Sequence, residues 1–391
     1  MANSISTALF PDIWKPMVQD FLNSSLVVKP ISNMRFESDL VAGDVLNFPY
    51  MADVRVQAYT AGTDLTIDDL TATQSAMSID QSRAATFYVD PTETRQSADK
   101  SWAAKMARQS AFVIAQEMDQ NVLKTGTDGA NVVVTGGTLS ASTVLSKFGE
   151  AMQRLEEANA TDGEMFAVIS PYVKNLLFQA EVANGFNKAD TALSNGFVGP
   201  SSTGFKIYVS NNLETSVTLT VATIPTAGDT ITVYGVTFTA AASGAASAAG
   251  EFSIGANAAA AQANIKLAIN GTGTAGATTY IDVSADNRRK LQNRQIAAST
   301  FATNVTTITG FGRINGTETL TAAADVFGTE SSDLLFGRVG ALSIGMQMYP
   351  ELYVRPEPKK LGDNYITHTL YGKKVFFRDA ARLVDMTYNQ V

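Results

Sequence analysis

The residue types that most often do chemistry in proteins are almost missing from this chain. Its 391 residues include no cysteine and a single histidine, His368. These side chains supply most thiolate nucleophiles, metal ligands and proton shuttles near neutral pH. His368 stands between two threonines of a predicted strand, where it is either an ordinary strand side chain or a pH-sensitive contact. The composition therefore predicts a protein that is not an enzyme.

The remaining candidate sites lack the spacing that their chemistry needs. A Ser-His-Asp triad would need His368, but no G-x-S-x-G sequence places a serine at a strand-to-helix elbow. The acidic pairs Glu156-Glu157 and Asp68-Asp69 lack the alternating carboxylates and the glycine of a calcium loop. The glycine-rich segments lack the Lys-Ser/Thr that ends a phosphate loop. We therefore expect no catalytic residue, no metal site and no cofactor.

The charge balance limits the partners that this chain can have. Its formal net charge is -8, which argues against tight, non-specific binding of DNA. The short basic run Arg288-Arg289-Lys290, with Arg294, is either a weak nucleic-acid contact or the exposed face of a helix. Charged residues make up 17% of the chain, against about 25% in typical globular proteins, which favours an oligomer. Met1 to Phe10 lacks the basic and apolar segments of a secretory signal.

Residues 41–90 predict a long β-hairpin. Strand-forming residues flank a polar stretch from Tyr59 to Thr73, in which Gly62-Thr63-Asp64 predicts a turn. Isolated two-stranded hairpins are marginally stable in water. We therefore expect this arm to lie on a neighbouring surface.

Residues 92–124 predict the longest helix, and residues 140–216 an α/β unit. Small and apolar residues recur along the helix at steps of three and four, and Gly126 is its expected end. Residues 142–160 predict an amphipathic helix, followed by a strand from Met165 to Ile169. Ser170-Pro171 predicts the start of the next helix, and a further strand is expected from Phe205 to Val209.

Residues 217–328 differ in composition from the rest of the chain. They are rich in threonine, alanine and glycine, and they hold six acidic and six basic residues, so the full -8 lies elsewhere. Strands are expected near 230–238, 280–283 and 305–320, with a helix near 258–269. After residue 330, Leu335, Val339, Leu342 and Met346 predict a helix that ends before Pro350, and strands follow. We interpret 217–329 as a domain inserted into an α/β subunit.

Several segments resemble the major capsid proteins of tailed bacteriophages. Met1-Ala2-Asn3-Ser4 with Leu9-Phe10-Pro11-Asp12-Ile13-Trp14 is similar to their N-terminal arm. Gly43-Asp44-Val45-Leu46-Asn47-Phe48-Pro49, Gly62-Thr63-Asp64-Leu65-Thr66 and Ser78-Ile79-Asp80-Gln81 resemble their extended loop. Leu370-Tyr371-Gly372-Lys373-Lys374-Val375 fits the closing strands. The resemblance covers residues 1–214 and 330–391 and omits the inserted segment.

The resemblance implies an α+β chain with the Hong Kong phage-type capsid fold and a β-rich inserted domain. The expected parts are the N-terminal arm (1–40), the extended loop (41–91), the spine helix with the peripheral domain (92–139), the axial domain (140–216 and 330–350), the inserted domain (217–329) and the C-terminal strands of the peripheral domain (351–391).

The resemblance also implies a function and partners. It implies hexamers and pentamers of this chain in an icosahedral shell around double-stranded phage DNA, without sequence-specific DNA binding. A scaffolding protein, a portal and a decoration protein are further expected partners, and no membrane is. We expect assembly in the bacterial cytoplasm and a final place in the virion. Expected contacts between subunits involve Trp14 and the acidic hairpin residues Asp64, Asp68 and Asp69.

Two other functions stay open at this point. An encapsulin-like nanocompartment shares the fold but encloses enzymes. A surface adhesin or fibre protein would use the segment 217–329 as a module that binds a glycan.

Overall fold

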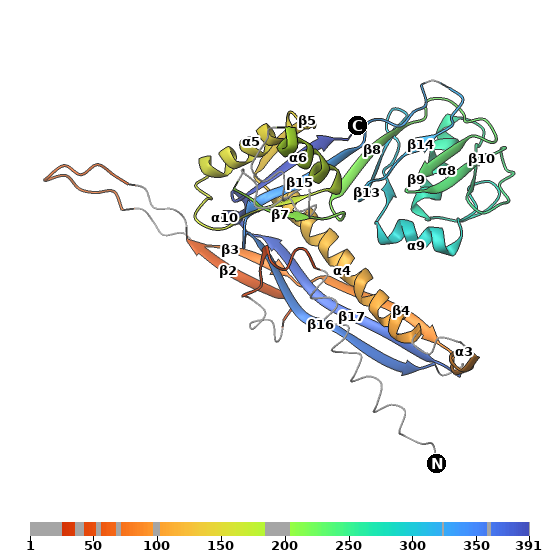
Figure 1. Ribbon diagram of the computed structural model, residues 1–391, viewed down its shortest axis with the longest axis horizontal. Helices are drawn as coiled ribbons and strands as arrows, with labels where there is room; N and C mark the ends of the chain where they lie inside the picture. Colours follow the sequence, from red (N-terminus) through yellow and green to blue (C-terminus); the bar gives the residue numbers. More distant parts are fainter. Residues whose placement is uncertain are drawn as a thin grey trace, which may run out of the picture. The chain divides into compact units, whose positions relative to one another are not determined.

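The computed structural model describes residues 26–35, 43–51, 56–67, 72–96, 102–183, 204–322, 324–357 and 361–390. This part of the chain divides into two compact units (Figure 1). The first unit holds residues 32–114 and 340–380, and the second holds 26–31, 115–339 and 381–391. Among the described residues, no helix is long and apolar enough to cross a membrane.

The first unit is built on an antiparallel sheet with a hairpin beside it. The sheet has the strand order β1-β16-β17-β4, with β1 (Ser32–Asn33), β4 (Gln81–Val89), β16 (Leu342–Pro356) and β17 (Asp363–Val375). β1 is the exception to the antiparallel pattern, since it runs parallel to β16. The hairpin is formed by β2 (Val45–Met51) and β3 (Ala72–Ser78). Two short helices complete this unit, α3 (Pro91–Gln96) and α10 (Phe377–Ala380).

The long helix α4 (Trp102–Gly129) contributes residues to both units. In the first unit, Ala107 and Ala111 are buried and pack with Phe87 of β4. Small side chains at these positions let the helix approach the sheet closely, so that the hydroxyls of Ser110 and Thr367 lie 3.0 Å apart. In the second unit, Met118 and Val122 continue the buried stripe. The predicted stripe is confirmed, whereas the predicted end at Gly126 is wrong because α4 continues to Gly129.

The second unit contains a mixed sheet with the strand order β12-β13-β8-β15-β18-β5. β15 also pairs with β6, which in turn pairs with β7. The strands are β5 (Val132–Thr138), β6 (Met165–Ile169), β7 (Lys206–Val209), β8 (Glu214–Thr220), β12 (Ala297–Ala298), β13 (Val305–Phe311), β15 (Ser331–Arg338) and β18 (Leu383–Asn389). β6–β7 and β18–β5 are parallel pairs, and β8 joins β13 to β15 by antiparallel pairing.

Helices α5 (Val144–Glu157) and α6 (Pro171–Ala183) cover one face of this central sheet. The helical spacing of Val144, Phe148 and Leu155 buries all three, and the ring of Phe148 meets Phe336 of β15 edge-on at 4.9 Å. α6 begins where the sequence predicted, since the Val173 amide donates to the Ser170 hydroxyl at 3.3 Å. The predicted elements α5, β6, α6 and β7 are confirmed.

A separate hydrophobic core forms entirely from residues between Val217 and Ile314. A second sheet, of order β11-β10-β9-β14, borders it, with β9 (Thr230–Val233), β10 (Val236–Ala241), β11 (Glu251–Ser253) and β14 (Thr317–Glu318). Tyr234 and Gly235 both have positive φ and form the two-residue turn between β9 and β10. Helices α8 (Ala258–Asn270) and α9 (Ala285–Asn293) complete this region, and Ile265 of α8 is buried in its core.

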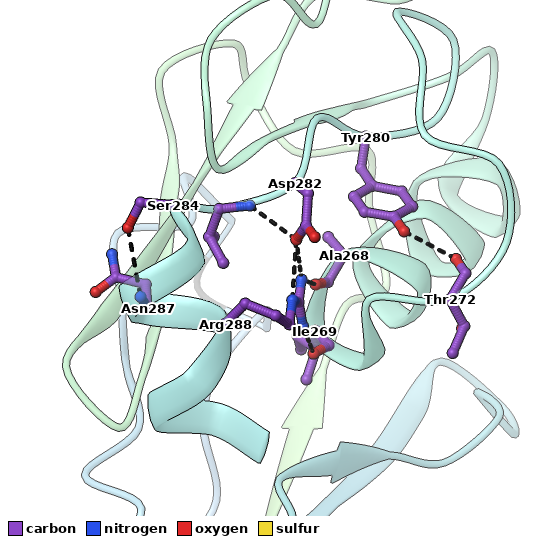
Figure 2. Close-up of polar contacts among 9 residues, drawn as sticks. Ala268, Ile269, Thr272, Tyr280, Asp282, Ser284, Asn287 and Arg288 are labelled. Carbon is purple, nitrogen blue, oxygen red and sulfur yellow. Dashed lines mark hydrogen bonds and ion pairs between the residues drawn. The ribbon is translucent and has the colours of Figure 1, made fainter. Parts of the chain in front are cut away.

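Arg288, the first residue of the basic run in α9, points into the protein instead of lying on an exposed face. Arg288 is buried, and its guanidinium donates to the carbonyl oxygens of Ala268 at 2.7 Å and Ile269 at 2.8 Å (Figure 2). These carbonyls belong to the last turn of α8, where carbonyl oxygens have no hydrogen-bond donor within the helix. The same guanidinium pairs with Asp282, its Nε donating at 2.9 Å. Arg288 therefore joins the end of α8, the loop before α9 and α9 itself.

Gly271 leaves room for this support. It ends α8 with a φ of +62°, in the left-handed region that favours glycine. A Cβ atom at this position would lie 2.6 Å from Cζ of Arg288, so any side chain would displace the guanidinium.

Other predictions in this part of the chain were incomplete or wrong. The helix expected over 331–350 is wrong, because these residues form β15 and the start of β16. Residues 334–337 are buried in succession, and a strand covered on both faces gives an apolar run that imitates a helix. The strand expected near 280–283 is a single bridge between Tyr280 and Phe252.

We predict that Arg288→Leu lowers the free energy of unfolding by about 2–3 kcal/mol, because it leaves two helix-end carbonyls and a carboxylate without their charged donor. Urea unfolding followed by circular dichroism measures this. Arg289→Gln is the matched control, since Arg289 makes an exposed pair with Asp286 within α9. An equal loss from both variants would contradict the support role.

Candidate functional site

The hairpin β2–β3 presents backbone and apolar side chains to solvent. Its strands pair in unbroken register from Val45–Ser78 to Met51–Ala72. Beyond them, Thr63 closes a turn by donating its amide to the Thr60 carbonyl at 3.1 Å. The predicted hairpin is therefore confirmed for residues 45–51 and 72–78, with its turn near Gly62. Its expected continuation to residue 90 is wrong, because residues 81–89 form β4 and pair with β17 in the four-stranded sheet.

Large apolar side chains lie on this exposed arm. Val56 is 101% exposed and Ile67 90%, and Tyr59 and Leu65 are also exposed. Exposed apolar side chains gathered on one segment indicate a surface that a partner covers.

The base of the hairpin is anchored within the first unit by residues 376–378. The ring of Phe48 meets Phe376 edge-on at 4.8 Å, and Tyr50 stacks on Phe377 at 5.7 Å. Arg378 donates to the Met51 carbonyl at 2.9 Å. These aromatic pairs fix the base while the residues beyond it stay exposed. We call Phe376, Phe377 and Arg378 the anchor.

A buried carboxylate holds residues 26–31 in the second unit. Asp119 of α4 accepts the amide of Val27 at 3.1 Å and that of Val28 at 3.2 Å. Val28 and Ile31 are fully buried. Burial raises the pKa of Asp119 to about 6, although the hydrogen bonds from Val27, Val28 and Asn212 oppose the shift.

Two further carboxyl groups have raised pKa values. Burial raises the pKa of Asp333 in β15 to about 6 and that of Asp385 in β18 to about 7. Sequence reasoning missed Asp119, Asp333 and Asp385. Asp119 alone carried a visible signal, since it is a charged residue directly beside Met118 of the predicted apolar stripe and one turn after Ala115.

His368 lies in β17 and its Nε2 is 2.9 Å from the hydroxyl of Ser82 in β4. Ser82 is exposed and stands in a strand rather than at a strand-to-helix elbow. The pair is a cross-strand hydrogen bond between an exposed serine and a half-buried histidine.

Of the acidic candidates, Glu156 and Glu157 are exposed surface charges, and Asp68-Asp69 lies outside the described residues. Glu157 lies in α5, where hydrogen bonds from Gln153 and Arg154 lower its pKa. Within the described ranges, no group of three or more His, Cys, Asp or Glu residues is placed to hold a metal ion. Arg294 donates to the Tyr234 hydroxyl at 2.9 Å and to the Asn211 carbonyl at 2.9 Å, so it serves the local structure.

Comparison with known proteins identifies the fold. No protein-family model and no curated protein matches this sequence. A structure from Mycobacterium phage Che8 is 14% identical, with a TM-score of 0.56 over 92% of this chain and 90% of that chain. The capsid structure of cyanophage P-SCSP1u is 12% identical, with a TM-score of 0.49 over 94% and 89%. The mature capsid of bacteriophage PhiM1 is 14% identical, with a TM-score of 0.46 over 93% and 87%.

The chain has the tailed-phage capsid fold. The expected α+β capsid fold is thus confirmed, whereas the inserted domain stays a prediction.

The predicted contact residues fall in different places. Asp64 lies in the exposed part of the hairpin. Trp14, Asp68 and Asp69 lie outside the described residues. Their role between subunits stays a prediction.

We predict that Phe376→Ala loosens the hairpin base. An aromatic pair contributes about 0.5–1.5 kcal/mol, so amide exchange in β2 and β3 should quicken by about two- to tenfold. Hydrogen exchange with mass spectrometry measures this. Phe112→Ala, at an exposed position of α4, is the control and should leave β2 and β3 unchanged. Unchanged exchange in Phe376→Ala would show that the anchor does not hold the hairpin.

We predict that Asp119→Asn makes the protein more stable above pH 6. The pKa of Asp119 in the folded chain lies above its ordinary value of 3.8. Its contribution to stability is therefore complete below about pH 4 and is lost as pH rises through about 6. Asparagine keeps an acceptor for Val27 and Val28 without the buried charge, and the gain near pH 8 should be on the order of 2 kcal/mol.

Thermal unfolding between about pH 4 and pH 8 measures this effect. Asp64→Asn, at an exposed position, is the matched control and should retain the wild-type pH profile. A variant less stable than the wild type at every pH would contradict the prediction.

Proposed function

We propose that this chain is a major capsid protein that self-assembles into the icosahedral shell of a tailed phage and encloses its double-stranded DNA. The capsid fold supports this proposal, and one observation carries it further. The extended loop exposes Val56, Tyr59, Leu65 and Ile67 on an arm that is anchored only at its base. Such an arm is suited to lie across another copy of the chain.

A shell of this kind is held by many contacts that are individually weak. The same chain has to occupy pentamers and hexamers, in which the contacts differ slightly. A packed α/β unit keeps its shape while the arm adapts to each position. Many simultaneous contacts make the closed shell stable, and the weakness of each contact lets misplaced copies leave during assembly. This role requires no catalytic residue and no cofactor.

We further propose that residues 217–329 form an inserted domain that supports folding or contacts neighbouring copies. Its own core and its neutral charge support this division of the chain. Position 217 lies inside β8, whose residues 215 and 216 pair with β15. A deletion of the domain therefore has to retain the start of β8.

The remaining partners follow from the proposed shell. A separate scaffolding protein, a portal and a decoration protein are proposed partners, with assembly in the bacterial cytoplasm. The charge of -8 lies outside residues 217–328. An acidic inner wall would not hold DNA tightly, which suits a container that has to release its contents.

Sedimentation of the recombinant chain, with electron microscopy of the fast fraction, tests the proposal. Closed shells hundreds of ångströms across are the expected result. If the chain alone gives only monomers or small oligomers, it is co-expressed with the proposed scaffolding protein and sedimented again. Shells that package a co-expressed enzyme rather than DNA would instead identify a nanocompartment. Trimers or filaments under both conditions would contradict a shell role and favour a fibre protein.

We predict that changing Asp64, Asp68 and Asp69 together to Asn impairs shell formation and leaves the monomer folded. Asp64 lies in the exposed arm, and Asp68 and Asp69 follow the arm in the sequence; we propose that the three carboxylates meet a basic surface of a neighbour. The yield of shells by sedimentation and the circular dichroism spectrum measure the two effects. Asp286→Asn on α9 is the control, at an exposed position far along the chain. Normal shells from the triple variant would exclude this acidic contact.

A further inference from the structure

Acidic side chains from neighbouring strands gather on one face of the central sheet. Thr215 pairs with Ser332, and Leu335 pairs with Asp385, so β8, β15 and β18 lie side by side. Because alternate residues of a strand point to opposite faces, Glu214, Asp333 and Asp385 share the face opposite to Phe336. α5 covers the Phe336 face, and the last turns of α4 bring Lys124 and Asp128 to the acidic face.

The charges on this face do not balance. Lys124 is the cation among the charged groups that act on Asp333 and Asp385, and it pairs with Glu214 and with Asp128 at 3.5 Å. Asp333 accepts a hydrogen bond from the Thr387 hydroxyl at 3.0 Å. Four carboxylates thus face one ammonium group. The carbonyl end of α4 adds a further partial negative charge.

Asp385 is the least compensated of these groups. The residue is 9% exposed, and its Oδ1 is buried without a hydrogen-bond partner among the described residues. Leaving a buried charge without a partner is costly, and protonation is the usual outcome. Burial raises the pKa of Asp385 to about 7, and the neighbouring Asp333, Asp128 and Glu214 add to the shift. These carboxylates are not placed to share a metal ion within the described ranges.

We propose that protons on Asp333 and Asp385 hold the C-terminal end of α4 on the central sheet, and that ionisation of these two carboxyls loosens it. Asp128 stands on the last turn of α4 beside the carbonyl end of the helix, so repulsion from ionised Asp333 and Asp385 acts on the helix end itself. Lys124 attracts Asp333 and opposes this repulsion, but it is one ammonium group against four carboxylates. The device lies inside the second unit and operates in the single chain, whether or not shells form.

The direction of the effect follows from the raised pKa values. Both lie above the ordinary aspartate value of 3.8, so the folded chain binds more protons than the unfolded one between about pH 4 and pH 7. The stabilising contribution is complete below about pH 4. It is lost as pH rises through about 6 for Asp333 and about 7 for Asp385.

Hydrogen exchange of the unassembled full-length chain tests the proposal. We expect opening of residues 121–129, corrected for the intrinsic pH dependence of exchange, to increase by about tenfold or more between about pH 5 and pH 8. The double variant Asp333→Asn with Asp385→Asn should stay closed at both pH values, because its carboxamides cannot ionise. Asp286→Asn is the control and should open as the wild type does.

Three results would overturn the proposal. The first is a wild-type chain whose residues 121–129 open equally at both pH values, which requires no variant. The second is a double variant that keeps the wild-type pH dependence. If the double variant does not fold, the single variant Asp333→Asn is measured in its place, because its carboxamide retains an acceptor for the Thr387 hydroxyl. The third is saturable closing by Mg²⁺ or Ca²⁺ near pH 8, since a bound cation would then be the missing partner.

Discussion

A two-stranded hairpin cannot cover its own faces, and this constraint explains the arrangement of the first unit. β2 and β3 pair only with each other, and a ribbon of this kind is marginal in water. Its stability therefore has to come from groups at its base and from a surface beyond it. The anchor supplies the first through two aromatic contacts and the hydrogen bond from Arg378. In the proposed shell, another copy of the chain would supply the second by covering the exposed apolar side chains of residues 56–67.

The second unit combines a packed sheet with buried carboxyl groups whose ionised form is disfavoured by burial. α5 and β15 bury aromatic rings on one face, and the opposite face carries the carboxyl groups of Asp333 and Asp385. α4 covers this second face with its last turns. Residues 217–314 add a core of their own, and Arg288 supports the end of α8 within it. The pH response proposed above concerns the C-terminal end of α4, where the helix meets these carboxyl groups.

Sequence reasoning succeeded where local periodicity decides the structure. The spacing of Phe148 and Leu155 and the Ser170-Pro171 start signal were enough to place α5 and α6. It failed over 331–350, because β15 is buried on both faces and its apolar run has no period of two. The turn at Gly340, with a φ of +90°, was the missed boundary between β15 and β16.

The buried polar groups could not be predicted for a different reason. Asp119 meets Val27 across 92 residues of chain, and Asp333 approaches Asp385 only through strand pairing. Such contacts depend on the tertiary fold and leave no local pattern. The basic run at 288–290 is similar, since periodicity placed it on a helix but could not reveal that Arg288 turns inward. The hairpin was predicted, yet its anchor lies more than 300 residues further along the chain.

The most direct test of the central claim is whether the hairpin touches another copy of the chain. A photo-crosslinking amino acid at Tyr59, which is exposed, can be placed in particles assembled from mixed ¹⁴N- and ¹⁵N-labelled chains. Mass spectrometry of the crosslinked peptides separates contacts within a chain from contacts between chains. The account predicts mixed-isotope peptides that join residue 59 to a second copy. Crosslinks confined to peptides of a single isotope would show that the arm folds back on its own subunit and would contradict it.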